Sequence, residues 1–133
     1  MKQITVRLKP GQDLRKEIDK IIKEQQIKAG VILSLVGSLN KAVLRMAGAV
    51  PGKDEIKTFE GPFEIVSVTG TVGMNDCHIH IAVSSKDGLA FGGHLKEGCI
   101  VRVTAEVVLL VFDDIEYKRQ YNDKTGYDEL LVE

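Results

Sequence analysis

Apolar and polar residues alternate along much of this chain, with the period of two that is typical of half-buried β-strands. The alternation is clear in residues 4–8 and in residues 77–83, and β-branched residues run through residues 63–72. Further apolar segments also predict strands, and they comprise residues 31–36, 43–47, 89–94 and 100–112. A bend at Gly37-Ser38 is expected to separate the second strand from the third.

A single segment near the N-terminus has the period of a helix instead. Its apolar residues share one helical face, and they are Leu14, Ile18, Ile21 and Ile22. Asp13 is a good N-cap, so we expect a helix from Asp13 to about Gln26, closed by Ala29-Gly30. One helix followed by many strands predicts an α+β, sandwich-like domain: a mainly antiparallel sheet with one principal N-terminal helix.

Two segments lack a clear period. Residues 48–62 are rich in Gly, Pro and charge and are expected to form an exposed loop. Residues 113–133 hold three tyrosines and predict a short helix or an arm. We therefore place the domain core at residues 1–112. The acidic extension at 113–133 is expected to pack on the same domain or on a neighbouring subunit.

The bulk composition fits one soluble domain. The chain has 133 residues, of which 44% are hydrophobic and 28% charged. It has neither a membrane-length apolar run nor the apolar segment of a secretory signal at its first residues. Cys77 and Cys99 form no CxxC pair and look like small core residues in a reducing compartment. We expect a cytoplasmic protein without membrane contact.

Charge is balanced overall but unevenly distributed. The formal net charge is −1, which is weak for a DNA-binding protein because phosphate contacts need clustered Lys and Arg. Residues 1–28 carry eight bases against four acids, and residues 113–133 carry three bases against seven acids. An ordinary solvated helix face explains the basic end better than a nucleic-acid footprint does.

All three histidines fall between residues 78 and 94, and they are the candidate metal ligands. His78 and His80 share one face of the expected strand, with Cα atoms roughly 6.6 Å apart from two rises of ~3.3 Å. His94 follows Gly92-Gly93. Three imidazoles with an open position are typical of an exchangeable or catalytic zinc site. The alternative is that these histidines are simply solvated.

The choice depends on the turn at Lys86-Asp87-Gly88. A three-residue hairpin loop with Gly88 in the left-handed conformation would place His94 opposite His80. A two-residue Asp87-Gly88 loop would place Leu95 there instead and turn His94 to the other face. A bulge at Gly92-Gly93 could also reset the register.

Several segments, in order along residues 4–112, resemble the plants-and-prokaryotes conserved (PPC) domain. They are Pro10-Gly11-x-Asp13-Leu14, Ala29-Gly30-Val31-Ile32-Leu33-Ser34-x-Val36-Gly37-Ser38-Leu39, Ala42-x-Leu44-Arg45, Gly61-Pro62-Phe63-Glu64-Ile65-Val66-Ser67, His78-Ile79-His80, Gly92-Gly93-His94-Leu95 and Thr104-Ala105-Glu106. The resemblance implies a compact unit with one main helix and a homotrimer. In plants the domain accompanies AT-hooks in nuclear DNA-binding proteins, and bare prokaryotic members are commonly labelled as DNA-binding. Several of these carry a metal on three histidines, at the positions of His78, His80 and His94.

This chain departs from the plant pattern. It has no Arg-Gly-Arg-Pro hook, and Pro62 stands where plant members have an arginine. The three histidines are not a plant feature, so the metal and the plant function need not belong together.

Three functions follow as expectations. The first is a homotrimeric, transcription-associated protein that binds DNA only weakly on its own and holds zinc or another divalent transition metal. The second is a small zinc-dependent metalloenzyme, in which metal-bound water meets a small-molecule substrate and Glu106 is the candidate base. The third is an assembly module that the metal merely stabilises. Glu64 is a further candidate for supporting the metal ligands, although Glu106 and Glu64 are also explained as ordinary exposed strand residues.

Overall fold

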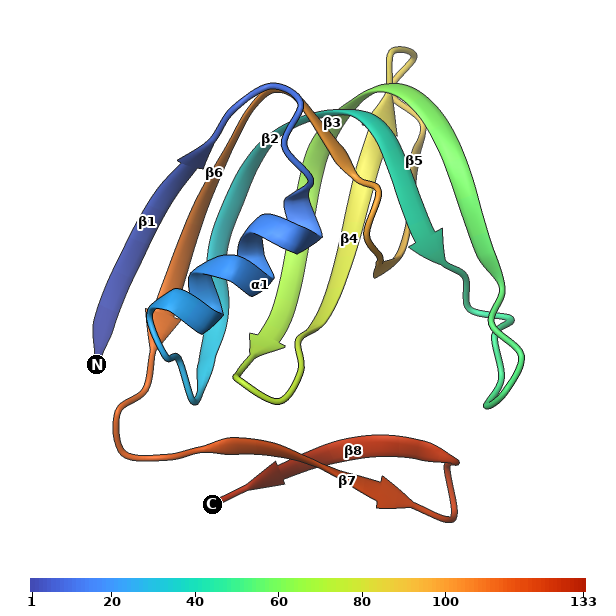
Figure 1. Ribbon diagram of the computed structural model, residues 1–133. Coiled ribbons are helices and arrows are strands. Elements are labelled where there is room, and N and C mark those ends of the chain that lie inside the picture. The colour runs from blue at the N-terminus through green and yellow to red at the C-terminus, as the bar shows by residue number, and fades with distance from the viewer.

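The computed structural model describes residues 1–133 as a mainly antiparallel sheet with a single helix, which confirms the expected fold class (Figure 1). The elements are β1 (Lys2–Leu8), α1 (Leu14–Glu24), β2 (Gly30–Arg45), β3 (Ile56–Val72), β4 (His78–Ser85), β5 (Ala90–Leu95), β6 (Ile100–Val111), β7 (Tyr117–Asn122) and β8 (Tyr127–Val132). In Figure 1 the strands arch behind and above α1, and the β7–β8 hairpin lies below them. The helix is too short and too polar to cross a membrane.

Six strands form one sheet in the order β1-β6-β2-β3-β4-β5. The end of β2 also pairs with β5, through Leu44 with Leu95 and Arg45 with His94. Strands β2, β3, β4 and β5 therefore close into a ring of pairings, while β1 and β6 extend the sheet on one side. This closure brings the end of β2 to the strand that carries His94.

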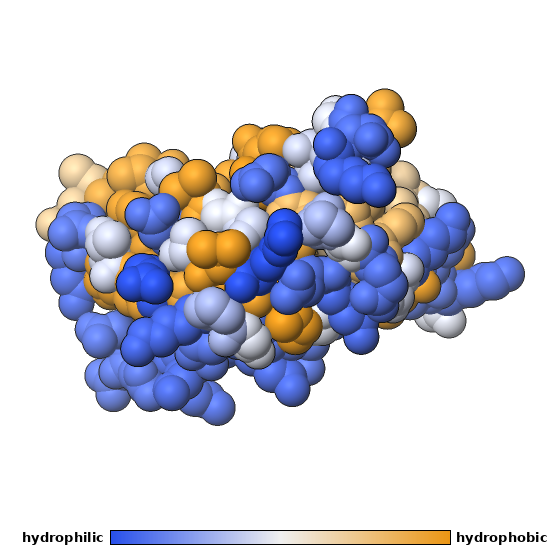
Figure 2. All heavy atoms as spheres, turned by 90° about the horizontal axis from the view of Figure 1, so that it is seen from above, coloured by the Kyte–Doolittle hydropathy of each residue, from blue (hydrophilic) through white to orange (hydrophobic).

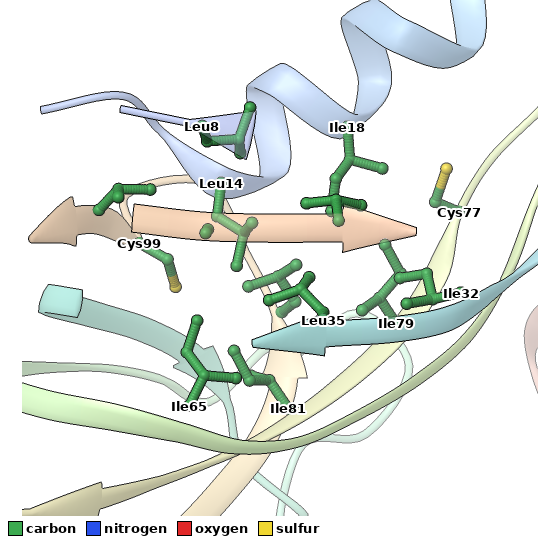
Figure 3. Close-up of a cluster of buried hydrophobic side chains, with 14 of the residues drawn as sticks. Leu8, Leu14, Ile18, Ile32, Leu35, Ile65, Cys77, Ile79, Ile81 and Cys99 are labelled. Atoms are coloured by element: carbon green, nitrogen blue, oxygen red, sulfur yellow. The ribbon is translucent and has the colours of Figure 1, made fainter. Parts of the chain in front are cut away.

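The helix forms and packs as its sequence predicts. The Asp13 carboxylate accepts a hydrogen bond from the Lys16 backbone N–H at 3.1 Å, which caps the first turn. The apolar face is buried against the sheet, and Figure 3 shows Leu14 and Ile18 lying toward strand residues such as Leu35 and Ile79. This burial fixes α1 on the inner face of the arch and leaves the other sheet face without a helix.

The predicted end of the helix needs a small correction. The last helical residue is Glu24, and Gln26 has a φ of 52°, in the left-handed region. This conformation ends the helix before Ala29-Gly30, which belongs to the approach to β2. The reversal places Ile27 in the core, where it is only 1% exposed.

The bend expected at Gly37-Ser38 does not divide two strands, so that prediction was wrong. Residues 30–45 form one strand, whose pairing with β6 shifts register at three places. Such bulges bend a strand without ending it. At Gly37 the backbones approach so closely that a Cβ would overlap the Thr104 carbonyl oxygen. Gly37 therefore permits the bend while the strand continues.

The exposed loop is shorter than predicted, because β3 begins at Ile56 rather than near Phe63. Residues 56–60 pair with the end of β2. Phe59 lies against the Phe91 ring, with 4.5 Å between centroids. This apolar contact stabilises a segment that its charged residues had suggested to be a loop.

The C-terminal segment is a β-hairpin, which excludes the short helix considered for it. The Tyr117 backbone N–H donates to the Lys28 carbonyl at 3.0 Å, and the Asn75 amide donates to the Tyr117 carbonyl at 3.2 Å. Arg119 on β7 donates to the Thr71 hydroxyl on β3 at 3.3 Å. These contacts hold the hairpin beside the ends of β3 and β4, close to the histidines.

Candidate metal centre

The turn between β4 and β5 decides how the histidines meet. The Ser85 backbone N–H donates to the Leu89 carbonyl, and Gly88 N–H donates to the Ser85 carbonyl, both at 2.9 Å. Gly88 has a φ of 81°, as a three-residue loop with a left-handed glycine requires. His94 consequently pairs directly with His80. Of the alternatives open from the sequence, the three-residue loop is confirmed.

The three imidazoles converge on the outer face of the sheet. On β4, His78 and His80 alternate with the buried side chains of Ile79 and Ile81, which fix which way the strand faces. One ring nitrogen from each histidine lies within 4.8 Å of those of the other two. The Nε2 atoms of His78 and His80 are 3.0 Å apart.

The surroundings of His94 and His78 favour neutral rings. Burial, followed by the positive charge of Arg45, lowers the pKa of His94 to about 3. Burial also lowers the pKa of His78, and His80, Arg119 and Arg45 add to the effect. A neutral imidazole offers the lone pair that a metal ion needs.

The donor set fits a divalent transition metal. In tetrahedral zinc sites the Zn–N bonds are ~2.0–2.1 Å, so two ligand nitrogens lie about 3.3 Å apart. Separations between 3.0 Å and 4.8 Å require only small side-chain rotations to reach this geometry. An Arg45 guanidinium nitrogen lies 3.4 Å from Nδ1 of His94. If the ion bound to Nδ1, the Arg45 side chain would have to move away from it.

The predicted acidic partners lie elsewhere. Glu106 on β6 is paired with Arg7 and Val36, and β2 and β3 separate β6 from the histidine strand β4. Three inter-strand spacings put it about 14 Å from β4. Glu64 is exposed and stands opposite Ser38 and Ser84. The structure does not bring either acid to the histidines.

Other charged and aromatic residues border the histidines instead. Arg45 from the end of β2 and Tyr127 from β8 line hollows on two sides of His94. On one of these sides Arg119, Asp76, Asp128 and Glu129 complete the wall. Sequence reasoning missed these residues, although Arg45 stands within one of the motif segments. These residues reach the histidines through the β2–β5 pairing and the C-terminal hairpin. Both bring together parts of the chain that are distant in the sequence, so local patterns do not reveal them.

The chain belongs to the Plants and Prokaryotes Conserved domain family (PPC above, also abbreviated PCC), whose family model matches residues 1–113. Among curated proteins it is 40% identical over 130 residues to the bifunctional protein GlmU of Synechococcus sp. (strain JA-3-3Ab). That match covers 96% of this chain, but the chain spans only about a fifth of the relative's length.

Solved structures share the fold over nearly the whole chain. A hypothetical protein from Salmonella enterica has a TM-score of 0.92 at 33% identity, covering 99% of this chain and 93% of that one. A metal-containing protein from Archaeoglobus fulgidus has a TM-score of 0.84 at 31% identity, covering 98% and 94%. A protein from Bacteroides thetaiotaomicron, provisionally named as DNA-binding, has a TM-score of 0.86 at 28% identity, covering 96% and 90%.

Proposed function

We propose that this PPC-domain chain is a metal-binding protein in which His78, His80 and His94 hold one divalent transition-metal ion, with zinc the first choice. The convergence of three imidazole nitrogens within 4.8 Å carries the proposal. A structural relative at 31% identity is named as metal-containing, which supports it. Three imidazole ligands leave a coordination position for water or another ligand.

A zinc competition titration with a chromophoric chelator tests this site. Wild-type protein should bind one equivalent per chain, and His80→Ala should weaken the affinity by a hundredfold or more because one of three protein ligands is lost. Ser84→Ala, a change on the same face of β4, serves as the control and should bind as wild type does. Equal affinity in wild type and His80→Ala would rule out the three-histidine site.

Association with DNA is the second candidate function. A relative provisionally named as DNA-binding supports it, and so does a row of exposed lysines on α1, formed by Lys16, Lys20 and Lys23. With a net charge of −1, the chain should bind weakly and without sequence preference. Fluorescence anisotropy with duplex DNA at two salt concentrations measures this. We expect the Lys16→Gln/Lys20→Gln/Lys23→Gln variant to lose DNA binding. Unchanged binding would show that these lysines do not contact DNA.

Homotrimer formation completes the proposal. Exposed apolar side chains on β2, β3 and β6 support a subunit contact, and they are Leu33, Val36, Val66 and Val103, each at least 54% exposed. Figure 2 shows hydrophobic residues along the left and middle of the upper edge of the view, whereas the lower edge is mostly hydrophilic. Burial of such a face by like subunits would remove it from water.

A further inference from the structure

A cavity of about 420 Å³ lies against the histidines on the side of β5 and the β2–β3 loop. His80 and His94 form one wall. Met46, Ala47 and Ala49 and the ring of Tyr127 supply apolar surface on the others. Its size lies in the range of cavities that hold small organic ligands.

Arg45 is the sole charged residue in the lining of this cavity, and it has no acidic partner. Its guanidinium lies 3.4 Å from His94 and 5.6 Å from the centre of the Tyr127 ring, and it forms no salt bridge. A half-buried guanidinium beside neutral rings is a strong donor without an anionic acceptor. Arg45 and two of the three candidate metal ligands, His80 and His94, therefore face the same small volume.

The hollow on the other side of His94 has the opposite character. It shares Arg45 and also contains Arg119, but Asp76, Asp128 and Glu129 line it as well. Three carboxylates against two guanidinium groups disfavour an anion there. The charges thus direct an anionic ligand to the cavity beside β5 rather than to the side of the C-terminal hairpin.

We propose that this cavity binds a small monocarboxylic acid with a short aliphatic chain. The carboxylate binds jointly to Arg45 and to the ion on His78, His80 and His94, and the aliphatic part lies against Met46, Ala49 and Tyr127. A guanidinium and a metal ion both select carboxylate oxygens, and the apolar wall selects against highly charged or bulky polar acids. This inference rests on the metal site proposed above and names the class of ligand that the site takes.

Calorimetric titration of the zinc-loaded protein with isovalerate tests the class directly. Its neutral isostere isovaleramide should bind at least about tenfold more weakly, since it loses the charge-assisted contact to Arg45. The metal-free protein should also bind isovalerate at least about tenfold more weakly, because it lacks the contact to the ion. Equal affinity for the acid and the amide would overturn the carboxylate class, and equal affinity with and without zinc would overturn the joint contact.

Variants separate the two walls of the cavity. Arg45→Gln should weaken isovalerate binding about ten- to a hundredfold, and Arg45→Lys should restore part of it. Arg102→Gln, an exposed arginine on β6, is the control and should have no effect. Ala49→Phe fills the space beside the apolar wall. It should weaken the binding of isovalerate, whereas formate, which has no aliphatic chain, should bind as before. Unchanged isovalerate binding in both Arg45→Gln and Ala49→Phe would place the ligand elsewhere.

The zinc content of every variant, measured by elemental analysis, keeps the two proposals apart. A protein that binds no zinc contradicts the metal site itself. A protein that binds one zinc per chain but shows no preference for the acid contradicts only the inference about the ligand.

Discussion

At the scale of single residues, burial and neighbouring cations favour the neutral form of His78 and His94. A carboxylate, a backbone carbonyl or a water usually orients a metal-bound histidine, but the side chain that contacts the His94 ring nitrogen is the guanidinium of Arg45. Partial burial, followed by the charge of this cation, lowers the pKa of His94 to about 3. The neutral rings of His78 and His94 can bind a cation at neutral pH, and the lowered pKa of His94 makes the fold less stable in acid.

The metal-free protein should lose unfolding free energy as the pH falls from 7.5 to 5. The unfolded chain binds a proton at His94 near its ordinary pKa of 6.5, whereas the folded chain does so only near pH 3, so protons favour the unfolded state between these values. We expect a loss of about 1 kcal/mol from this residue, reduced from the full linkage value because the ring is partly open to solvent.

Urea unfolding followed by circular dichroism at the two pH values measures this loss. The His94→Asn variant lacks the titrating ring and should show a smaller decrease. Parallel pH dependence in wild type and variant would mean that His94 titrates normally in the folded protein.

At the scale of elements, the β4–β5 hairpin determines whether the site exists. A turn was predictable at Lys86-Asp87-Gly88, but its length was not, and the alternation of residues 77–83 was enough to place His78 and His80 together. The pairing of β2 with β5 was not predictable, because it joins Arg45 to His94 across 49 residues. For the same reason, the three candidate ligands were predictable from the sequence, whereas the residues around them were not.

Gly88→Ala should destabilise the fold by about 1 kcal/mol, because an L-residue is strained at positive φ. No atom lies within 4 Å of the added Cβ, so the backbone conformation alone causes the effect. Thermal or urea unfolding gives the value, and Asp87→Ala in the same loop is the control. A Gly88→Ala protein as stable as Asp87→Ala would contradict the left-handed turn.

Asp13→Ala should cost about 2 kcal/mol of unfolding free energy. The carboxylate caps α1 through the Lys16 N–H and also accepts from the Gly98 N–H at 2.7 Å, so it ties the helix to the loop before β6. Asp13→Asn keeps one side-chain oxygen and should lose less. Equal losses in the two variants, measured by urea unfolding, would show that the hydrogen bonds do not account for the stability.

At the scale of the whole molecule, the sheet has one face covered by α1 and one face without such cover. The alternating pattern predicted the covered face well, since the core residues of the strands follow it. It could not show what meets the other face, because exposed apolar residues look the same whether they contact solvent or a second subunit.

Val36→Asp should convert trimers to monomers if that face is the subunit contact, because a buried, unpaired carboxylate is costly. Sedimentation equilibrium measures the change in mass. Val50→Asp is a matched control, since Val50 is similarly exposed but lies in the loop between β2 and β3. A monomeric wild-type protein, or a trimer that survives Val36→Asp, would contradict this contact.

The proposal that His78, His80 and His94 hold one metal ion can be tested by crystallography. Diffraction data from crystals of the untagged, zinc-loaded protein are measured on both sides of the zinc absorption edge. We expect one strong anomalous peak per chain, with all three imidazoles within about 2.0–2.1 Å of the zinc ion. The absence of this peak, or a peak beside other residues, would rule out the three-histidine site.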